Sequence, residues 1–193
     1  MGVPKHKEGT FTYSDYLQWP DEERWELIHG IAYNMSPAPS KTHQRIVGEM
    51  FRRLANITDT RPCDTLIAPF DVRLFTGSPD EADELVETVV QPDISVFCDP
   101  EKIDERGGKG APDLVVEVLS PATAHKDQTE KLKLYDEAGV REYWIVNAEA
   151  AYIMVYRRGA SGVFGKPDYY TREESVKSEV LDASIALSPI FGG

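Results

Sequence analysis

A carboxylate in the middle of an apolar run is the first sign of chemistry in this sequence. Glu117 lies within segment 114–119, which reads LVVEVL and is typical of a buried strand. Burial of an unpaired carboxylate is costly, so such a group takes up a proton, pairs with a cation or binds a metal ion. Asp93, which follows Pro92 at the start of another apolar segment, and Lys131 on the next predicted helix are the groups that can join it.

Two acids and an ammonium group in one place would suit a divalent-metal nuclease. Phosphodiester hydrolysis needs a hard cation that polarises the phosphate and lowers the pKa of the attacking water. Magnesium takes oxygen ligands, often one or two carboxylates together with waters and substrate phosphate. We therefore predict a Mg²⁺ site, which Mn²⁺ can also fill, held by Asp93, Glu117 and the backbone carbonyl of Val118. Lys131 would orient the attacking water or neutralise charge in the transition state.

Each of these residues also has a purely structural interpretation. The stem of Lys131 can cover apolar surface while its ammonium reaches water, and Glu117 can face solvent or form a salt bridge with Lys131. A Pro-Asp pair is common in turns. Asp113 also follows a proline, but it lies on the strand of Glu117, some 13 Å away at ~3.3 Å per residue. Because that distance prevents both acids from holding one ion, Asp93 is the better partner.

Helices and strands must bring these residues together. Apolar residues at helical spacing predict a helix over 41–57. A second helix over about 124–138 is expected to be capped by Thr123 and closed by Gly139. Segment 99–110 is expected to be a loop. A short helix is expected near 12–17, and strands are expected within 25–34 (two), over 65–75, 88–97, 113–119, 141–146 and 151–156, and at the periphery near 163–171 and 178–185.

This order of elements predicts a single domain over 1–193 with a core of about 12–158 and peripheral strands over 160–190. Strand, helix and strand over 113–146 suggest a right-handed βαβ unit. The whole is expected to be a mixed α/β or α+β fold.

Composition narrows the class of protein. The chain has 193 residues and a formal net charge of −12, which argues against strong sequence-independent attraction to nucleic acid. No apolar run approaches the ~20 residues that span a bilayer, and residues 1–10 lack the apolar core of a signal peptide. Cys63 and Cys98 are too few for a disulfide scaffold and their spacing suggests no zinc site. The expected location is the cytoplasm, with no membrane contact.

Several motifs together give a resemblance to a known family. They are RWELIHG at 24–30, SP at 36–37, HQRIV at 43–47, QPDISV at 91–96, PDLVVEVLSP at 112–121, Lys131, Tyr135, GV at 139–140 and EYWIV at 142–146. In these segments, over roughly 13–156, the chain resembles the Uma-two family, a branch of the PD-(D/E)XK restriction-endonuclease-like superfamily.

The resemblance implies a central mixed sheet of four or five strands with helices on both faces, and an endonuclease that hydrolyses DNA. It makes Asp93 the first acid and Glu117 the second. The superfamily pattern would place a lysine two residues after the second acid, where this chain has Leu119. The resemblance therefore points to Lys131, on the following helix, as the catalytic lysine.

Two further residues are secondary candidates. Glu26 would reach the metal, as an extra N-terminal acid does in related nucleases, or would be a surface strand carboxylate. His43 lies near the start of a long predicted helix, one turn before Ile46 and Val47, and is expected to face the sheet as a packing residue or a catalyst. The peripheral strands suggest a homodimer, since nucleases that cut both strands often work as dimers. The alternative function is a catalytically degraded module with a binding or regulatory role, favoured by Leu119 and by the net charge.

Overall fold

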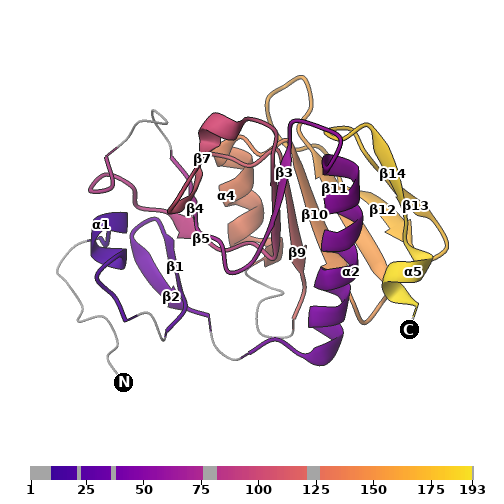
Figure 1. Cartoon of the computed structure of the whole chain (residues 1–193), viewed down its shortest axis with the longest axis horizontal. Coiled ribbons are helices and arrows are strands. Elements are labelled where there is room, and N and C mark those ends of the chain that lie inside the picture. The colour runs from indigo at the N-terminus through magenta and orange to yellow at the C-terminus, as the bar shows by residue number, and fades with distance from the viewer. Residues whose placement is uncertain (1–9, 21–22, 36–37, 76–81, 121–126, 193) are drawn as a thin grey trace.

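The computed structural model describes residues 10–20, 23–35, 38–75, 82–120 and 127–192. Figure 1 shows the chain passing from a small N-terminal part through a central sheet to a C-terminal hairpin. The helices are α1 (Tyr13–Tyr16), α2 (Lys41–Thr58), the 3₁₀ turn η1 (Pro100–Lys102), α4 (Glu130–Ala138) and α5 (Ser188–Phe191). The strands are β1 (Trp25–Ile28), β2 (Ile31–Asn34), β3 (Asp64–Ile67), β4 (Val72–Arg73), β5 (Val89–Val90), β6 (Ile94–Phe97), β7 (Ile103–Asp104), β8 (Gly107–Lys109), β9 (Leu114–Val118), β10 (Glu142–Asn147), β11 (Tyr152–Arg157), β12 (Asp168–Thr171), β13 (Ser175–Ser178) and β14 (Ala183–Ala186).

Two six-stranded sheets and one hairpin make up the β structure. The main sheet has the order β12-β11-β10-β9-β6-β3, and the N-terminal sheet has the order β2-β1-β5-β4-β8-β7. In the main sheet β9 and β10 are parallel, with α4 between them in sequence, and the other pairs are antiparallel. The predicted mixed fold, with a central mixed sheet flanked by helices, is confirmed. The central sheet has six strands rather than four or five, because β12, from the segment expected to be peripheral, joins its edge.

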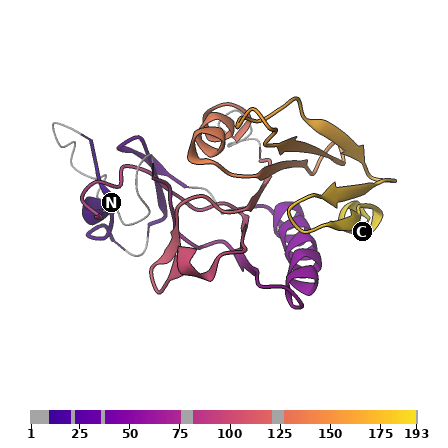
Figure 2. The same cartoon turned by 90° about the horizontal axis from the view of Figure 1, so that it is seen from above.

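The two faces of the main sheet are covered by different elements. On one face lie the apolar stripe of α2, the hairpin of β13 and β14, and α5, packed on Leu114, Val116 and Val118 of β9. On the other face α4 packs on Val115 together with residues of the N-terminal sheet. Figure 2 shows α2 and α4 on opposite sides of the strands. Because side chains alternate along a strand, Glu117 belongs to the α4 face, which it shares with Val115.

Local sequence explains where the two principal helices begin and end. Ser40 caps α2, since its side chain accepts a hydrogen bond from the backbone N–H of His43 at 3.2 Å. Gly139 closes α4 in the left-handed conformation, with φ of 95°. The capping residue proposed for α4, Thr123, lies outside the described residues. Within the described ranges, no helix has the length and apolarity to cross a membrane.

Two predicted strands prove to be pairs of short strands in different sheets. The prediction over 65–75 is wrong because the chain leaves the main sheet after β3 and joins the N-terminal sheet at β4, with Pro69 between them. The prediction over 88–97 is wrong in the same way, because β5 and β6 flank Pro92. Proline has no N–H to donate to a sheet ladder, so it marks both crossings.

The segments near the surface also differ in part from expectation. Residues 99–110, expected to be a loop, contain η1, β7 and β8. Gly107 is required at the start of β8, because its φ is 128° and a Cβ atom there would lie 2.2 Å from the backbone oxygen of Asp71. The peripheral strands are confirmed in kind, although they form β12, β13 and β14 with other bounds.

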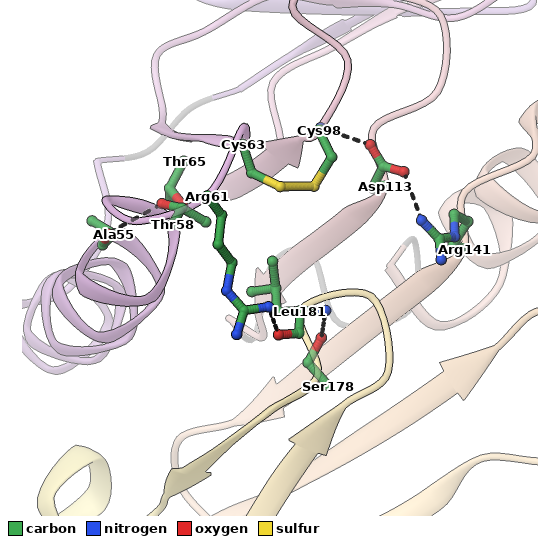
Figure 3. The surroundings of a disulfide bond; sticks show 10 residues. All are labelled: Ala55, Thr58, Arg61, Cys63, Thr65, Cys98, Asp113, Arg141, Ser178 and Leu181. Carbon is green, nitrogen blue, oxygen red and sulfur yellow. Dashed lines mark hydrogen bonds and ion pairs between the residues drawn. A yellow bond between two sulfur atoms is a disulfide. The ribbon is translucent and has the colours of Figure 1, made fainter.

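The two cysteines form a disulfide that the sequence did not predict. Cys63, which follows α2, is bonded to Cys98, which follows β6, across a sequence separation of 35 residues (Figure 3). Beside it the carboxylate of Asp113 accepts a hydrogen bond from the Cys98 backbone and binds Arg141 at 3.1 Å. The disulfide therefore ties the end of α2 to the strand that begins just after Asp93.

Candidate active site

Glu117 projects from β9 into a buried polar cluster beneath α4. Its Oε1 accepts hydrogen bonds from the Lys131 ammonium at 2.7 Å and from the Tyr135 hydroxyl at 2.9 Å. Lys131 and Tyr135 are one turn apart on α4, so both side chains leave the same side of the helix. Glu117 is only 5% exposed, which rules out the alternative of a solvent-facing strand position.

Lys131 is buried among carboxylates. Its Nζ lies 2.8 Å from Glu26, 2.7 Å from Glu117 and 3.8 Å from Asp127. The residue is 4% exposed, so the alternative in which its ammonium reaches bulk water is wrong. The alternative of a salt bridge with Glu117 is correct as a contact, and the catalytic role of Lys131 stays a prediction.

Asp93 lies where the chain crosses from the N-terminal sheet into the main sheet. Its Oδ2 accepts a hydrogen bond from the backbone N–H of Val118 at 2.8 Å. Its own backbone N–H lies 3.4 Å from Glu117 Oε2, so the two acids are immediate neighbours. The Asp93 side chain is 20% exposed, whereas the side chains of Glu117 and Lys131 are 6% and 5% exposed. Asp93 is therefore the member of this group that solvent or a substrate can reach.

His43 reaches Asp93 from the first turn of α2. Its Nε2 lies 3.2 Å from Asp93 Oδ2, and within the described part of the chain its buried Nδ1 has no hydrogen-bond partner. Burial favours the neutral ring, but the hydrogen bond and charge of Asp93 outweigh burial and raise the pKa of His43. His43 faces the sheet as predicted and contacts Asp93, and its catalytic role stays a prediction.

Glu26 completes the cluster from β1. Its Oε1 binds Lys131 at 2.8 Å and accepts the backbone N–H of Gln91 at 3.2 Å. Glu26 is 2% exposed, so the alternative of a surface strand carboxylate is wrong. It contacts the Lys131 ammonium, and its role as a metal ligand stays a prediction.

The cluster contains more carboxyl groups than cationic groups. The pKa of Glu117 is raised to about 8, chiefly by burial, with the carboxylates of Asp127, Asp93 and Glu26 also raising it and Lys131 lowering it. Burial would lower the pKa of Lys131, but the surrounding carboxylates hold it well above its usual value. Four carboxyl groups thus share one ammonium and one imidazole.

This donor set fits a hard divalent cation bound by few protein ligands. Asp93 and Glu117 meet through the Asp93 backbone N–H, which lies 3.4 Å from Glu117 Oε2. An added positive charge would oppose both burial and the neighbouring carboxylates, which raise the pKa of Glu117. Among the described residues no group of three or more acidic, histidine or cysteine side chains is arranged to hold a metal ion. The fit therefore rests on two carboxylates, a number that magnesium often uses with waters and substrate phosphate. The Val118 carbonyl as a further ligand stays a prediction.

Three contributors to the cluster were not predicted from the sequence. Asp127 precedes Lys131 by four residues, the spacing of a helical ion pair, and that signal was available. Tyr135 follows Lys131 by four residues, and it was named above only as part of the family resemblance, with no role for its hydroxyl. Gln91 supports Glu26 through its backbone, which no side-chain pattern reveals.

Comparisons with known proteins place this geometry in context. A protein-family model named Uma2 and described as "Putative restriction endonuclease" matches residues 13–188. An uncharacterised protein of Synechocystis is 28% identical over 184 residues, covering 93% of this chain and 90% of that protein. A crystal structure from Anabaena variabilis, titled as a putative nuclease, superimposes with a TM-score of 0.73 at 19% identity, covering 94% of this chain and 97% of that one. The likeness in fold and the match over 13–188 agree with the predicted Uma-two resemblance, and the chain belongs to the Uma2 family.

Proposed function

We propose that this protein is a divalent-metal-dependent endonuclease that hydrolyses DNA phosphodiester bonds. The observation that carries the proposal is the placement of Asp93 and Glu117 side by side, with the Lys131 ammonium 2.7 Å from Glu117. The family and the fold neighbour favour a nuclease. The choice of DNA and the need for metal are the parts that we propose.

Each residue of the site has a role in this proposal that follows from its position. Asp93, Glu117 and the backbone carbonyl of Val118 would hold Mg²⁺ or Mn²⁺, which when bound supplies Lewis-acid catalysis and activates water. His43 fixes the orientation of the Asp93 carboxylate through Nε2. Lys131 balances the charge of Glu117, and its positive charge would stabilise negative charge that develops on the phosphate once metal and substrate are bound.

The net charge of −12 is compatible with binding of DNA at the candidate active site. Part of the acidic excess is concentrated in the buried cluster around Lys131, where bound metal would offset it. Electrostatic attraction to DNA is then local and depends on the cation.

A cleavage assay tests the proposal directly. Purified protein is incubated with plasmid and with single-stranded DNA in the presence of Mg²⁺, Mn²⁺ or EDTA. We expect cleavage only with metal, its loss in Asp93→Asn, and its retention in Asp64→Asn, a matched change of an exposed acid on β3. If cleavage occurs and Asp93→Asn leaves it unchanged, the assignment is wrong.

One observation favours the alternative of a non-catalytic binding or regulatory module. The Lys131 ammonium is already paired with Glu26 and Glu117, and Leu119 occupies the usual position of the superfamily lysine. Calorimetry with Mg²⁺ and Mn²⁺ separates the two functions. A degraded site is expected to bind neither ion, whereas an active site is expected to bind both through Asp93.

A homodimer and a cytoplasmic location stay predictions. Strand β12 lies at the edge of the main sheet, and three of its four residues are exposed, which leaves an edge to which a second copy can add a strand. Light scattering after gel filtration tests the dimer. The Cys63–Cys98 disulfide is of a kind that is rare in reducing compartments, so thiol alkylation of protein from intact cells tests the location.

A further inference from the structure

A cavity of about 580 Å³ adjoins the candidate active site on the side of the N-terminal sheet. Its wall comes from α1 and the residues after it, from the approach to β1, and from the crossings before β4 and β6. Hydrogen-bonding and aromatic groups are supplied to this wall by Tyr16, Trp19, Arg24, Phe70, Asp71 and Gln91. The size of the cavity falls within the range of about 300–1,000 Å³ that small-molecule sites occupy.

A fixed hydrogen-bonding group forms one wall of this cavity. The Gln91 amide donates to Asp71 Oδ1 at 2.8 Å and to the Tyr16 hydroxyl at 3.1 Å. Its carbonyl Oε1 accepts from Arg24 Nε at 3.0 Å and Nη2 at 2.7 Å. The Tyr16 hydroxyl donates to Asp71 Oδ1 at 2.9 Å, which closes the network. These donors and acceptors are therefore held in place before any ligand arrives.

Aromatic rings form another part of the lining. Trp19 is held by contacts with Phe11, Tyr16 and Trp25, at centroid distances of 5.3, 5.3 and 5.7 Å. Phe70 packs against Phe97 at 6.4 Å. Rings that are braced in this way provide flat faces on which a planar group can stack.

The charges around the cavity exclude a simple phosphate site. Two arginines, Arg24 and Arg106, face three acidic residues, Glu23, Asp71 and Glu105. A free anion would meet as much repulsion as attraction there. A planar, uncharged group with hydrogen-bonding edges fits the lining better, because the rings offer stacking and the outer members of the Gln91 network, Arg24 and Asp71, carry further donor and acceptor atoms that Gln91 holds in place.

The cavity is connected to the acid cluster through Gln91. The Gln91 side chain lines the cavity, while its backbone N–H binds Glu26, which in turn contacts Lys131. Asp93 follows Gln91 by two residues, so their Cα atoms lie within about 7.6 Å. Arg24, which lines the cavity, likewise precedes Glu26 by two residues. Two short stretches of chain therefore connect the lining of the cavity to the acid cluster.

We propose that this cavity holds one unstacked nucleobase of the substrate strand, next to the phosphodiester that is cut. This inference rests on the proposed nuclease function. A base within a duplex is stacked and paired, so it can enter only after extrusion, which costs several kcal/mol. The enzyme should therefore prefer DNA whose bases are unpaired.

Tryptophan fluorescence of the full chain without metal tests the pocket. The probes are the four deoxynucleosides, with deoxyribose and inorganic phosphate as controls. Deoxynucleosides are expected to quench the emission saturably, since a base stacks near Trp19, and the controls are expected to have no effect. Saturable quenching by deoxyribose or phosphate alone, or none by any deoxynucleoside, would overturn the proposal.

Variants assign the binding to this cavity. Phe70→Leu is expected to weaken binding about 5- to 150-fold, the range for loss of base stacking, and Tyr169→Leu, an exposed aromatic change on β12, should leave it unchanged. A folded Phe70→Leu protein with unchanged affinity would overturn the proposal. If that variant does not fold, photocrosslinking of wild-type protein to 5-iododeoxyuridine in single-stranded DNA is expected to label the peptide with Trp19 or with Phe70. Labelling elsewhere would overturn it.

Failure of the base pocket and failure of the nuclease proposal give different results. The Asp93→Asn variant is expected to bind deoxynucleosides like the wild type, because Asp93 does not line the cavity. If nucleosides bind as described and the wild type cuts no DNA with any metal, the nuclease proposal fails and the base pocket stands. With an active enzyme, single-stranded DNA is expected to be cut at least about tenfold faster than the same sequence in a duplex. Equal rates would overturn the preference for unpaired bases.

Discussion

Replacing Lys131 by methionine is expected to reveal how strongly one ammonium stabilises the buried acids. In the structure Nζ lies 2.8 Å from Glu26 and 2.7 Å from Glu117, and all three side chains are at most 6% exposed. Methionine fills similar volume without the charge. Removing one partner of a buried ion pair costs about 3–5 kcal/mol, because the remaining charge has neither water nor partner.

The matched control is Lys133→Met on the same helix. The Lys133 side chain is 76% exposed and lies 3.6 Å from Glu137, an exposed helical pair worth at most about 0.5 kcal/mol. Urea unfolding followed by circular dichroism gives both free energies of unfolding. For a domain of this size the loss at Lys131 corresponds to a fall in Tm of about 6–20 °C, against about 2 °C or less at Lys133.

The pH dependence of the loss follows from Glu117. Its pKa in the folded chain is raised from 4.5 to about 8, chiefly by burial, and Lys131 opposes that rise. A carboxyl group whose pKa is raised on folding favours the folded state below its unfolded pKa, and this stability is lost as pH rises through the folded-state pKa. Without the ammonium the folded-state pKa rises further, so the deficit of Lys131→Met should be larger at pH 8 than at pH 5.

A double variant makes this reasoning refutable. Glu117→Gln in the Lys131→Met background removes the stranded carboxylate, so its effect should be less destabilising than the sum of the single changes by at least about 1 kcal/mol. Additive effects, or a Lys131→Met protein within about 1 kcal/mol of the wild type at pH 8, would show that the cluster is not coupled as described.

Three further outcomes are expected. His43→Ala should lower cleavage about 10- to 100-fold, the usual effect of losing a residue that orients a metal ligand such as Asp93, and it should weaken Mn²⁺ binding measured by calorimetry. Cys63→Ser with Cys98→Ser should lower the free energy of unfolding by about 4 kcal/mol, from closure of a loop of 35 residues, with unchanged stability contradicting the disulfide. Metal binding must displace the proton of Glu117, so cleavage at limiting Mg²⁺ should rise with pH, reach half its maximum near pH 8 and level off above it; a flat profile from pH 6 to 8 would contradict this.

The strand and helix that carry Glu117 and Lys131 could be predicted because their local patterns are strong. An apolar run indicated β9, and a helical spacing with a terminal glycine indicated the end of α4. Alternation along the strand puts Glu117 on the same face as Val115, and the structure shows that α4 packs on that face. Both elements are encoded by residues close together in the sequence, and both form in the structure.

Features that could not be predicted depend on contacts between distant segments. The short strands on either side of Pro69 and of Pro92 belong to two different sheets. A run of apolar residues predicts a strand but does not show that the chain passes from one sheet to the other within it. The bond of Cys63 to Cys98 requires the end of α2 to lie beside the end of β6. Burial of Glu26 beside Lys131 likewise appears only when the N-terminal sheet packs near α4.

Anomalous scattering from a crystal soaked in Mn²⁺ tests the central claim most directly. We predict one strong peak within about 2–2.6 Å of carboxylate oxygens of both Asp93 and Glu117, and its disappearance in Asp93→Asn. A peak bound to other residues, or no peak at a concentration of Mn²⁺ that supports cleavage, would contradict a metal centre shared by these two acids.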